Sequence, residues 1–204
     1  MKTMKRRQVL KLFASAPMAA AFAWTASEAA RAHQRAHSAR ARAVQTGAAF
    51  EPGFFTPHEY ETVRVLVDCI IPRDERSGSA TDAGVPEFMD FMMLDQPEGQ
   101  MAMRGGLAWL DVTCQKRFNR AFLDCTDTER RAGLDEIAWP ARARPEMSQG
   151  VAFFNSFRDL TATGFWTTKM GIEDLHYLGN EYVPEWTGCP EEASKKLGVS
   201  DEGE

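Results

Sequence analysis

The sequence lacks most of the short motifs that mark catalytic and cofactor sites. Its 204 residues contain no glycine-rich phosphate loop and no G-x-S-x-G nucleophile motif. There is no C-x-x-C-H, which excludes a covalently attached c-type haem on this chain. The four cysteines lack the close spacing that iron–sulfur clusters require. We therefore predict no catalytic and no cofactor-binding residue in this chain.

One fragment, residues 173–176 (Glu-Asp-Leu-His), resembles part of a metal site. On a helix, Glu-x-x-His places both side chains on one face, as in the di-iron helical bundles. Such sites need two copies of this motif and further carboxylates, and the chain has one copy. We predict no metal ligand, and we keep a metal-dependent enzyme that uses Glu173 and His176 as a rival hypothesis.

Cysteines are few, but an even number permits disulfides in an oxidising compartment. Cys69 lies in an apolar run and is expected to be a buried thiol. Cys114 and Cys125 flank the end of a predicted helix, and Cys189 lies near the C-terminus. The sequence alone does not decide how Cys114, Cys125 and Cys189 pair.

The first 32 residues have the features of an export signal. A basic head at Lys5, Arg6 and Arg7 precedes an apolar, alanine-rich run over residues 10–24, which is too short for a comfortable membrane span. The head resembles the twin-arginine pattern, which directs folded proteins across a membrane, although an ordinary secretory signal also begins with basic residues. We predict a twin-arginine-type signal over residues 1–32, with Arg6 and Arg7 as its paired arginines.

The segment that follows, residues 33–50, is basic, alanine-rich and without apolar periodicity, so we predict a flexible linker. Two short alanine-containing stretches before it, which end at Ala23 and Ala32, are candidate sites for cleavage of the signal. The sequence leaves the choice between them open.

The remaining part, residues 51–204, is strongly acidic. Nine of the 24 Lys and Arg residues and one of the 29 Asp and Glu residues lie in the first 50 positions. The rest of the chain therefore carries 15 basic and 28 acidic side chains, a net charge of −13. This charge argues against binding to nucleic acid or to anionic lipid.

We predict that this acidic part forms one all-α domain of five to six short helices, because strand signals are weak and apolar residues recur at helical spacing. Capping boxes predict helix starts at Thr56 and Thr126, since a Glu follows each Thr three residues later. Further helices are expected from Pro86, over residues 97–122 and from Ser148. The remainder is predicted to be a loop-rich, aromatic C-terminal tail.

Three motifs of the tail are distinctive: residues 164–171 (Gly-Phe-Trp-Thr-Thr-Lys-Met-Gly), residues 175–180 (Leu-His-Tyr-Leu-Gly-Asn) and residues 186–190 (Trp-Thr-Gly-Cys-Pro). In this order they resemble the closing motifs of the gluconate 2-dehydrogenase subunit 3 family, the small subunits of FAD-dependent sugar dehydrogenases. Residues 68–72 and 83–88 agree with the family's D-x-I-I-P and A-G-V-P-x-F motifs. The resemblance extends over about residues 54–199.

This resemblance implies a role outside catalysis. In the family, the large subunit is similar to the glucose–methanol–choline (GMC) oxidoreductases and holds FAD, and it usually lacks its own export signal. The small subunit carries the twin-arginine signal, and the assembled pair crosses to the periplasm through the twin-arginine translocase. The resemblance thus implies that this chain escorts and stabilises a folded flavoprotein subunit and holds no cofactor itself.

Two finer expectations also come from the resemblance. The Trp-x-Gly-Cys-Pro ending is most similar to that of subunits paired with dehydrogenases that oxidise glycosides at the 3-hydroxyl. A cytochrome c subunit is a further candidate member of the complex, which could then associate with the membrane. The remaining rival hypothesis is a stand-alone periplasmic binding or structural module.

The tail also supplies a candidate interface with the large subunit. Its aromatic residues gather where helical order is weakest, at Phe165, Trp166, Tyr177, Tyr182 and Trp186. A permanent partner would cover such a surface, since obligate interfaces are more apolar than the average protein surface. We predict that these five residues, with residues 153–157 beneath them, dock on the large subunit; the competing interpretation is packing within the domain.

Overall fold

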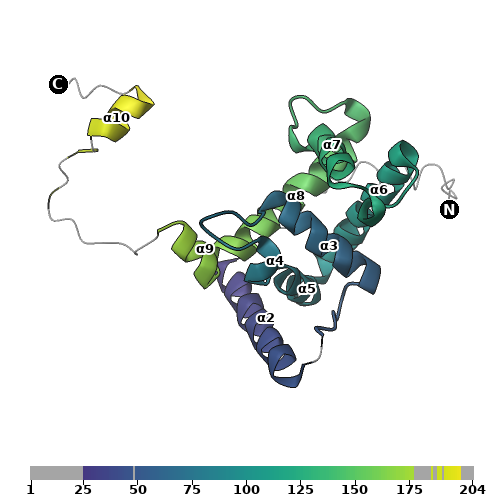
Figure 1. Cartoon of the computed structure of the whole chain (residues 1–204), viewed down its shortest axis with the longest axis horizontal. Helices are drawn as coiled ribbons and strands as arrows, with labels where there is room; N and C mark the ends of the chain where they lie inside the picture. Colours follow the sequence, from purple (N-terminus) through teal and green to yellow (C-terminus); the bar gives the residue numbers. More distant parts are fainter. Residues whose placement is uncertain (1–24, 48, 177–184, 186–187, 190, 199–204) are drawn as a thin grey trace, which may run out of the picture.

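The computed structural model describes residues 25–47, 49–176, 185, 188–189 and 191–198, and every regular element among them is helical (Figure 1). The all-α prediction is confirmed. The α-helices are α2 (Ala26–Thr46), α3 (Pro57–Ile70), α4 (Ala80–Ala83), α5 (Val85–Asp95), α6 (Gln100–Phe118), α7 (Asp127–Ala138), α8 (Ser148–Trp166), α9 (Lys169–Asp174) and α10 (Glu191–Leu197). Within the described residues, 3-10 turns precede α6, α7 and α8: η2 (Pro97–Gly99), η3 (Phe122–Asp124) and η4 (Pro145–Met147).

The two helix starts that capping boxes predicted from the sequence are both present in the structure. The Thr56 side chain accepts a hydrogen bond from the backbone N–H of Glu59, and the Glu59 carboxylate accepts one from the backbone N–H of Thr56. Thr126 and Glu129 do the same at the start of α7. Each box satisfies backbone donors that a helix end leaves unpaired, which is why these starts are readable locally.

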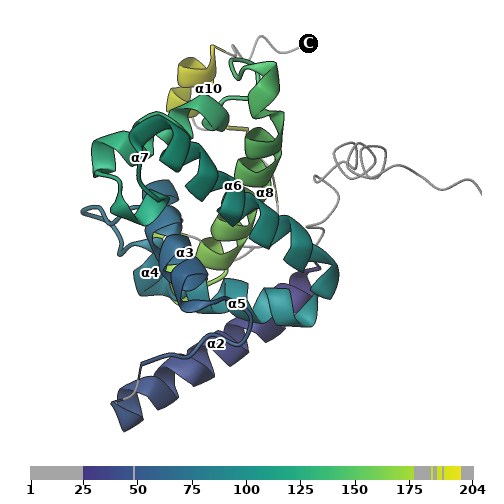
Figure 2. The same ribbon diagram turned by 90° about the vertical axis from the view of Figure 1, so that its right-hand side faces the viewer.

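Helix α8 is the central element of the domain, since it contacts α3, α5, α6, α7 and α9 (Figures 1 and 2). Its buried face carries Phe153, Phe157, Leu160 and Phe165, which lie in one core with Phe88 of α5. Apolar burial of this kind is the main favourable term in folding a domain of this size. Among the described residues, no helix is both long and apolar enough to cross a membrane.

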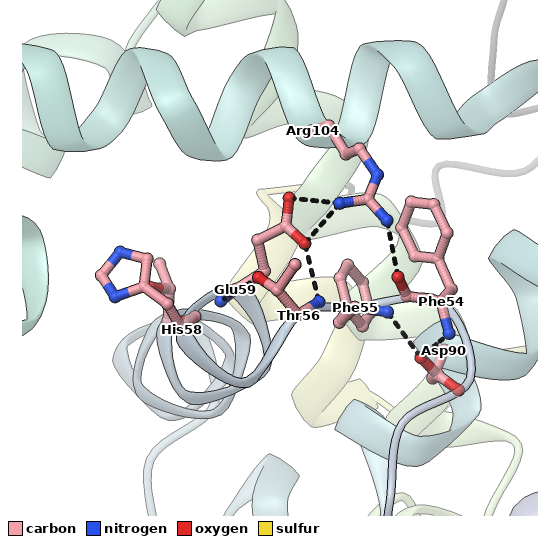
Figure 3. A network of polar contacts seen from close by, with 8 residues as sticks. Phe54, Phe55, Thr56, His58, Glu59, Asp90 and Arg104 are labelled. Carbon is pink, nitrogen blue, oxygen red and sulfur yellow. Dashed lines mark hydrogen bonds and ion pairs between the residues drawn. The ribbon is translucent and has the colours of Figure 1, made fainter.

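A buried carboxylate, Asp90 on α5, holds the segment that leads into α3. Asp90 is 1% exposed, and it accepts hydrogen bonds from the backbone N–H groups of Gly53 (2.8 Å), Phe54 (2.9 Å) and Phe55 (3.0 Å). Figure 3 shows this carboxylate below the turn that places Phe54 and Phe55. Three backbone donors replace the hydrogen bonds to water that the Asp90 side chain loses on burial.

A second contact joins the same segment to α6. Arg104 donates to both Glu59 carboxylate oxygens, at 2.9 and 2.7 Å, and to the carbonyl oxygen of Phe54 at 2.6 Å (Figure 3). Its guanidinium also lies 4.4 Å from the centre of the Phe54 ring. Through Asp90 and Arg104, the entry to α3 is therefore fixed to α5 and α6 at once.

The predicted flexible linker over residues 33–50 is wrong for most of its length, because α2 is helical through Thr46. One face of α2 is lined by alanines at helical spacing, and Ala29, Ala32 and Ala36 are buried against the core. Alanine has the highest helix propensity, and its small side chain lets α2 approach α5 closely (Figure 2). A search for large apolar residues at helical spacing misses such a face.

Polar contacts also dock α2 on the domain. The His33 ring stacks on Phe88, with 4.5 Å between the ring centres, and burial lowers the pKa of His33. Arg35 pairs with Asp95 at 3.2 Å, and Arg40 donates to the carbonyl oxygen of Asp82 at 2.9 Å. The predicted end of the signal at residue 32 therefore falls inside a packed helix.

Replacing Asp90 by Asn tests the clamp on the α3 entry. An amide carries no charge and one oxygen, so at least one of the three backbone N–H groups loses its acceptor. We expect the free energy of unfolding to fall by about 2–4 kcal/mol. The matched control is Asp159→Asn, at an exposed carboxylate beside Arg158, with an expected change of about 0.5 kcal/mol or less. Urea unfolding followed by circular dichroism measures both, and equal losses would contradict the role of Asp90.

Candidate partner-docking site

A tight turn between α8 and α9 forms the candidate site. Thr168 caps α9: its hydroxyl accepts a hydrogen bond from the Gly171 N–H at 3.0 Å and donates to the Phe165 carbonyl oxygen at 2.6 Å. Thr167 donates to the carbonyl oxygen of Thr163 at 2.6 Å. The two threonines of the sequence motif thus end one helix and start the next.

Gly171 makes this turn sterically feasible. A Cβ at this position would lie 2.2 Å from the carbonyl oxygen of Phe165 and 2.7 Å from the Cα of Trp166. Real Cβ atoms essentially never come closer than 3.0 Å to such atoms. Glycine therefore lets α9 fold back against the end of α8, which explains one of the two glycines in residues 164–171.

The hairpin exposes three large apolar side chains. Trp166 is 38% exposed, Ile172 is 40% exposed and Leu175 is 56% exposed. Ile172 lies in α9, and Leu175 is its C-terminal cap residue with a helical backbone conformation. Side chains three positions apart lie on one side of a helix. We call these three residues the α8–α9 patch.

Phe165 has a different environment from the one predicted. It is fully buried in the core, and its ring meets that of Trp166 edge-on, with 5.6 Å between the centres. The prediction that Phe165 anchors a partner is wrong, because successive helical residues point about 100° apart and Phe165 faces inward. Phe153 and Phe157 are likewise buried core residues.

The other predicted interface aromatics, Tyr177, Tyr182 and Trp186, lie outside the described residues, so their place in the interface stays a prediction. The sequence reasoning missed Ile172 and Leu175. Their signal was a pair of apolar residues three positions apart, beginning four residues after the capping Thr168, in a stretch that we expected to be loop.

The fragment with Glu173 and His176 does not form a metal site in the described part of the chain. Helix α9 ends at Asp174, and His176 lies beyond it with a positive φ of 51°. Glu173 is exposed and pairs with Lys169 at 3.7 Å. No group of three or more His, Cys, Asp or Glu side chains suited to a metal ion occurs in the region that the structure describes.

The cysteines are free thiols with two kinds of environment. Cys114 and Cys125 are buried, whereas Cys69 and Cys189 are exposed. The expectation that Cys69 is buried is wrong, because the buried face of α3 carries Val63, Leu66 and Val67, and Cys69 lies off that face.

An open groove of about 1200 Å³ adjoins the hairpin. It lies between α2, α4 and α9 and is lined by His33, His37, Arg40, Thr168 and Lys169, among others. Arg40 is held there by the carbonyl oxygen of Asp82 and by Glu87, 3.8 Å away. Helix α2 therefore supplies one wall of a hollow that borders the α8–α9 hairpin.

A comparison with protein families places this chain. The family model of gluconate 2-dehydrogenase subunit 3 matches residues 57–185, more than half of the chain. The chain belongs to the gluconate 2-dehydrogenase subunit 3 family. Searches of curated proteins and of solved structures found no match.

The match to gluconate 2-dehydrogenase subunit 3 begins with the first residue of α3 and includes the whole α8–α9 hairpin. The recognition made from the sequence motifs is thereby confirmed. Helix α2 lies before the matched span, although it packs on α5 inside it. The candidate docking site is thus built mainly from the part of the chain that carries the family pattern.

Gly171→Ala tests the steric account of the hairpin. The added methyl group overlaps the backbone of α8, so α9 must shift, and we expect a loss of about 1–3 kcal/mol in unfolding free energy. Gly105→Ala is the matched control, because open space surrounds that position in α6. Its expected effect is a gain of about 0.5–1 kcal/mol from helix propensity. Thermal denaturation measures both variants, and a neutral or stabilising Gly171→Ala would contradict the account.

Proposed function

We propose that this chain is the non-catalytic small subunit of an FAD-dependent dehydrogenase of sugars or glycosides. The observation that carries the proposal is the family match over residues 57–185, which makes the chain a subunit of a dehydrogenase complex. The absence of a dinucleotide-binding motif from the sequence agrees with a role outside catalysis. FAD then belongs to a GMC-type large subunit, and this chain holds it only through that partner.

The α8–α9 patch is the part of this chain that we propose to dock on the large subunit. Trp166 is well suited to be an anchor, since large aromatic residues supply most of the energy at interface hot spots. It stands on a rigid base, because Phe165 beside it is fixed in the core. Ile172 and Leu175 extend the apolar area toward the start of the tail, where Tyr177, Tyr182 and Trp186 follow in the sequence.

The second part of the proposal is export. A twin-arginine signal with Arg6 and Arg7 would carry this chain to the periplasm together with a flavoprotein that has already folded around FAD. Cleavage after Ala23 would leave α2 whole, with its capping residue Thr25 in place. Cleavage after Ala32 would remove the buried Ala29 and the first two turns of α2. The packing of α2 therefore favours a mature chain that begins at Trp24.

A glycoside 3-dehydrogenase as the paired enzyme and a cytochrome c subunit as a third member remain finer proposals, which rest on the Trp-x-Gly-Cys-Pro ending and on the family alone. No contact among the described residues favours the metal-dependent or the stand-alone hypothesis over the subunit role.

Trp166→Ala tests the docking proposal. We expect binding to the purified large subunit to weaken by about 2 kcal/mol or more, because an exposed anchor is lost. The melting temperature of the free chain should fall much less than that of Phe165→Ala, since Trp166 is 38% exposed and Phe165 is fully buried. Phe165→Ala is the matched control from the neighbouring position, and it should cost about 3–5 kcal/mol of stability. Isothermal titration calorimetry and thermal denaturation give the two quantities. Normal binding by Trp166→Ala would exclude Trp166 as an anchor.

The double variant Arg6→Lys/Arg7→Lys tests the export proposal. We expect this chain and its flavoprotein partner to stay in the cytoplasm, with the partner still folded and yellow. Fractionation followed by immunoblotting measures the location of both, and N-terminal sequencing of the exported wild-type chain should begin at Trp24. A partner that still reaches the periplasm would refute the escort role. A mature chain that begins at His33 would show that the first turns of α2 are removed and would refute cleavage after Ala23.

A further inference from the structure

Two buried cysteines lie in the core where α6 turns toward α7. Cys114 on α6 is 2% exposed, and Cys125, the residue after η3, is 3% exposed. Between them the chain reverses at Asn119, which ends α6 in the left-handed conformation with φ of 58°. The reversal brings η3 back against α6.

The return of the chain is fixed from both sides. Asp111, three residues before Cys114 on α6, accepts a hydrogen bond from the backbone N–H of Phe122 at 3.0 Å. Arg130 of α7 donates to the carbonyl oxygens of Phe122 at 3.1 Å and Leu123 at 2.5 Å. These contacts hold η3 on α6, so that Cys125 is presented to Cys114 by a constrained backbone.

Cys114 and Cys125 both belong to the buried core, on the two segments that the reversal brings together. Burial, and then the neighbouring Cys125, raise the pKa of Cys114 to about 12. In the reduced protein the Cys114 thiol is therefore protonated at neutral pH and reacts slowly, because the thiolate is the nucleophile in disulfide exchange.

We propose that Cys114 and Cys125 form an intramolecular disulfide after the chain reaches an oxidising compartment. The proposal rests on the export part of the proposed function, because cytosolic thiols are kept reduced. The pairing selects one of the alternatives that the sequence left open. It leaves Cys69 and Cys189, both exposed, outside the core pair.

The oxidant is a disulfide, either that of a thiol–disulfide oxidoreductase or that of oxidised glutathione. One core thiol loses its proton and attacks the oxidant, which releases one thiol and leaves a mixed disulfide. The second core thiol then attacks this intermediate and releases the other thiol of the oxidant. One S–S bond forms, and the two electrons from Cys114 and Cys125 reduce the oxidant's disulfide to two thiols.

The first experiment is a disulfide map of the exported chain. The full-length protein is collected from the periplasm, denatured in iodoacetamide and digested without reductant for mass spectrometry. We expect one linked species that contains Cys114 and Cys125, with Cys69 and Cys189 alkylated. The Arg6→Lys/Arg7→Lys chain from the cytoplasm should be alkylated at all four positions. Alkylation of Cys114 and Cys125 in the exported chain, or a link from either one to another cysteine, would overturn the proposal.

A second experiment separates the disulfide from export. Because both thiols are buried in the folded chain, the purified full chain is unfolded in urea and refolded with oxidised glutathione, and its melting temperature is compared with that of the chain refolded under reducing conditions. We expect a rise of about 5–10 °C, because the bond closes a short loop in the unfolded state. The Cys69→Ser/Cys189→Ser variant should show the same rise, and Cys114→Ala should show none.

If the wild-type chain is never exported but this linkage forms, the export proposal fails and the pairing stands. If no linkage forms, the pairing itself is wrong.

Discussion

The fold depends most directly on the buried carboxylate of Asp90. This carboxylate accepts hydrogen bonds from three backbone N–H groups of the turn before α3. Without these partners, burying the polar group would cost free energy of folding. The same turn carries Phe54, whose carbonyl oxygen and ring both meet Arg104 of α6. Arg104 in turn binds the carboxylate of Glu59, which accepts a hydrogen bond from the N–H of Thr56, the residue that caps α3. One connected network therefore sets the positions of α3, α5 and α6, and α8 packs among them.

The candidate docking site is held in place by this core, because it is built on the end of α8. Helix α8 is packed in the core over most of its length. Of its last two residues, Phe165 is buried in the core and Trp166 is exposed at the surface. Thr168 and Gly171 then turn the chain back so that α9 lies against α8. An apolar patch on a rigid, well-packed hairpin loses little conformational freedom on binding, which favours affinity. The distinctive motif of residues 164–171 is thus explained by the turn that it forms.

Local signals made part of this structure predictable. Thr56 and Thr126 cap helices through residues three positions away, so the sequence alone reveals them. Asp90 could not be recognised, because its donors lie more than 30 residues earlier and nothing in its own neighbourhood marks it. The sequence predicts a signal end and a linker where α2 lies, because the buried face of this helix is made of alanines rather than large apolar residues. Phe165 and Trp166 are adjacent aromatics, and only the orientation of α8 decides which one faces the core.

The central claim is that this chain serves a flavoprotein dehydrogenase without performing the chemistry itself. The most direct measurement is to purify the native complex by an affinity tag on this chain and to record flavin absorbance, sugar-dependent bleaching of the flavin and subunit composition. The account predicts a yellow complex that contains a second, larger subunit, and a colourless, inactive chain once the two are separated. A chain that elutes alone without flavin, or a separated chain that keeps flavin and activity, would contradict it.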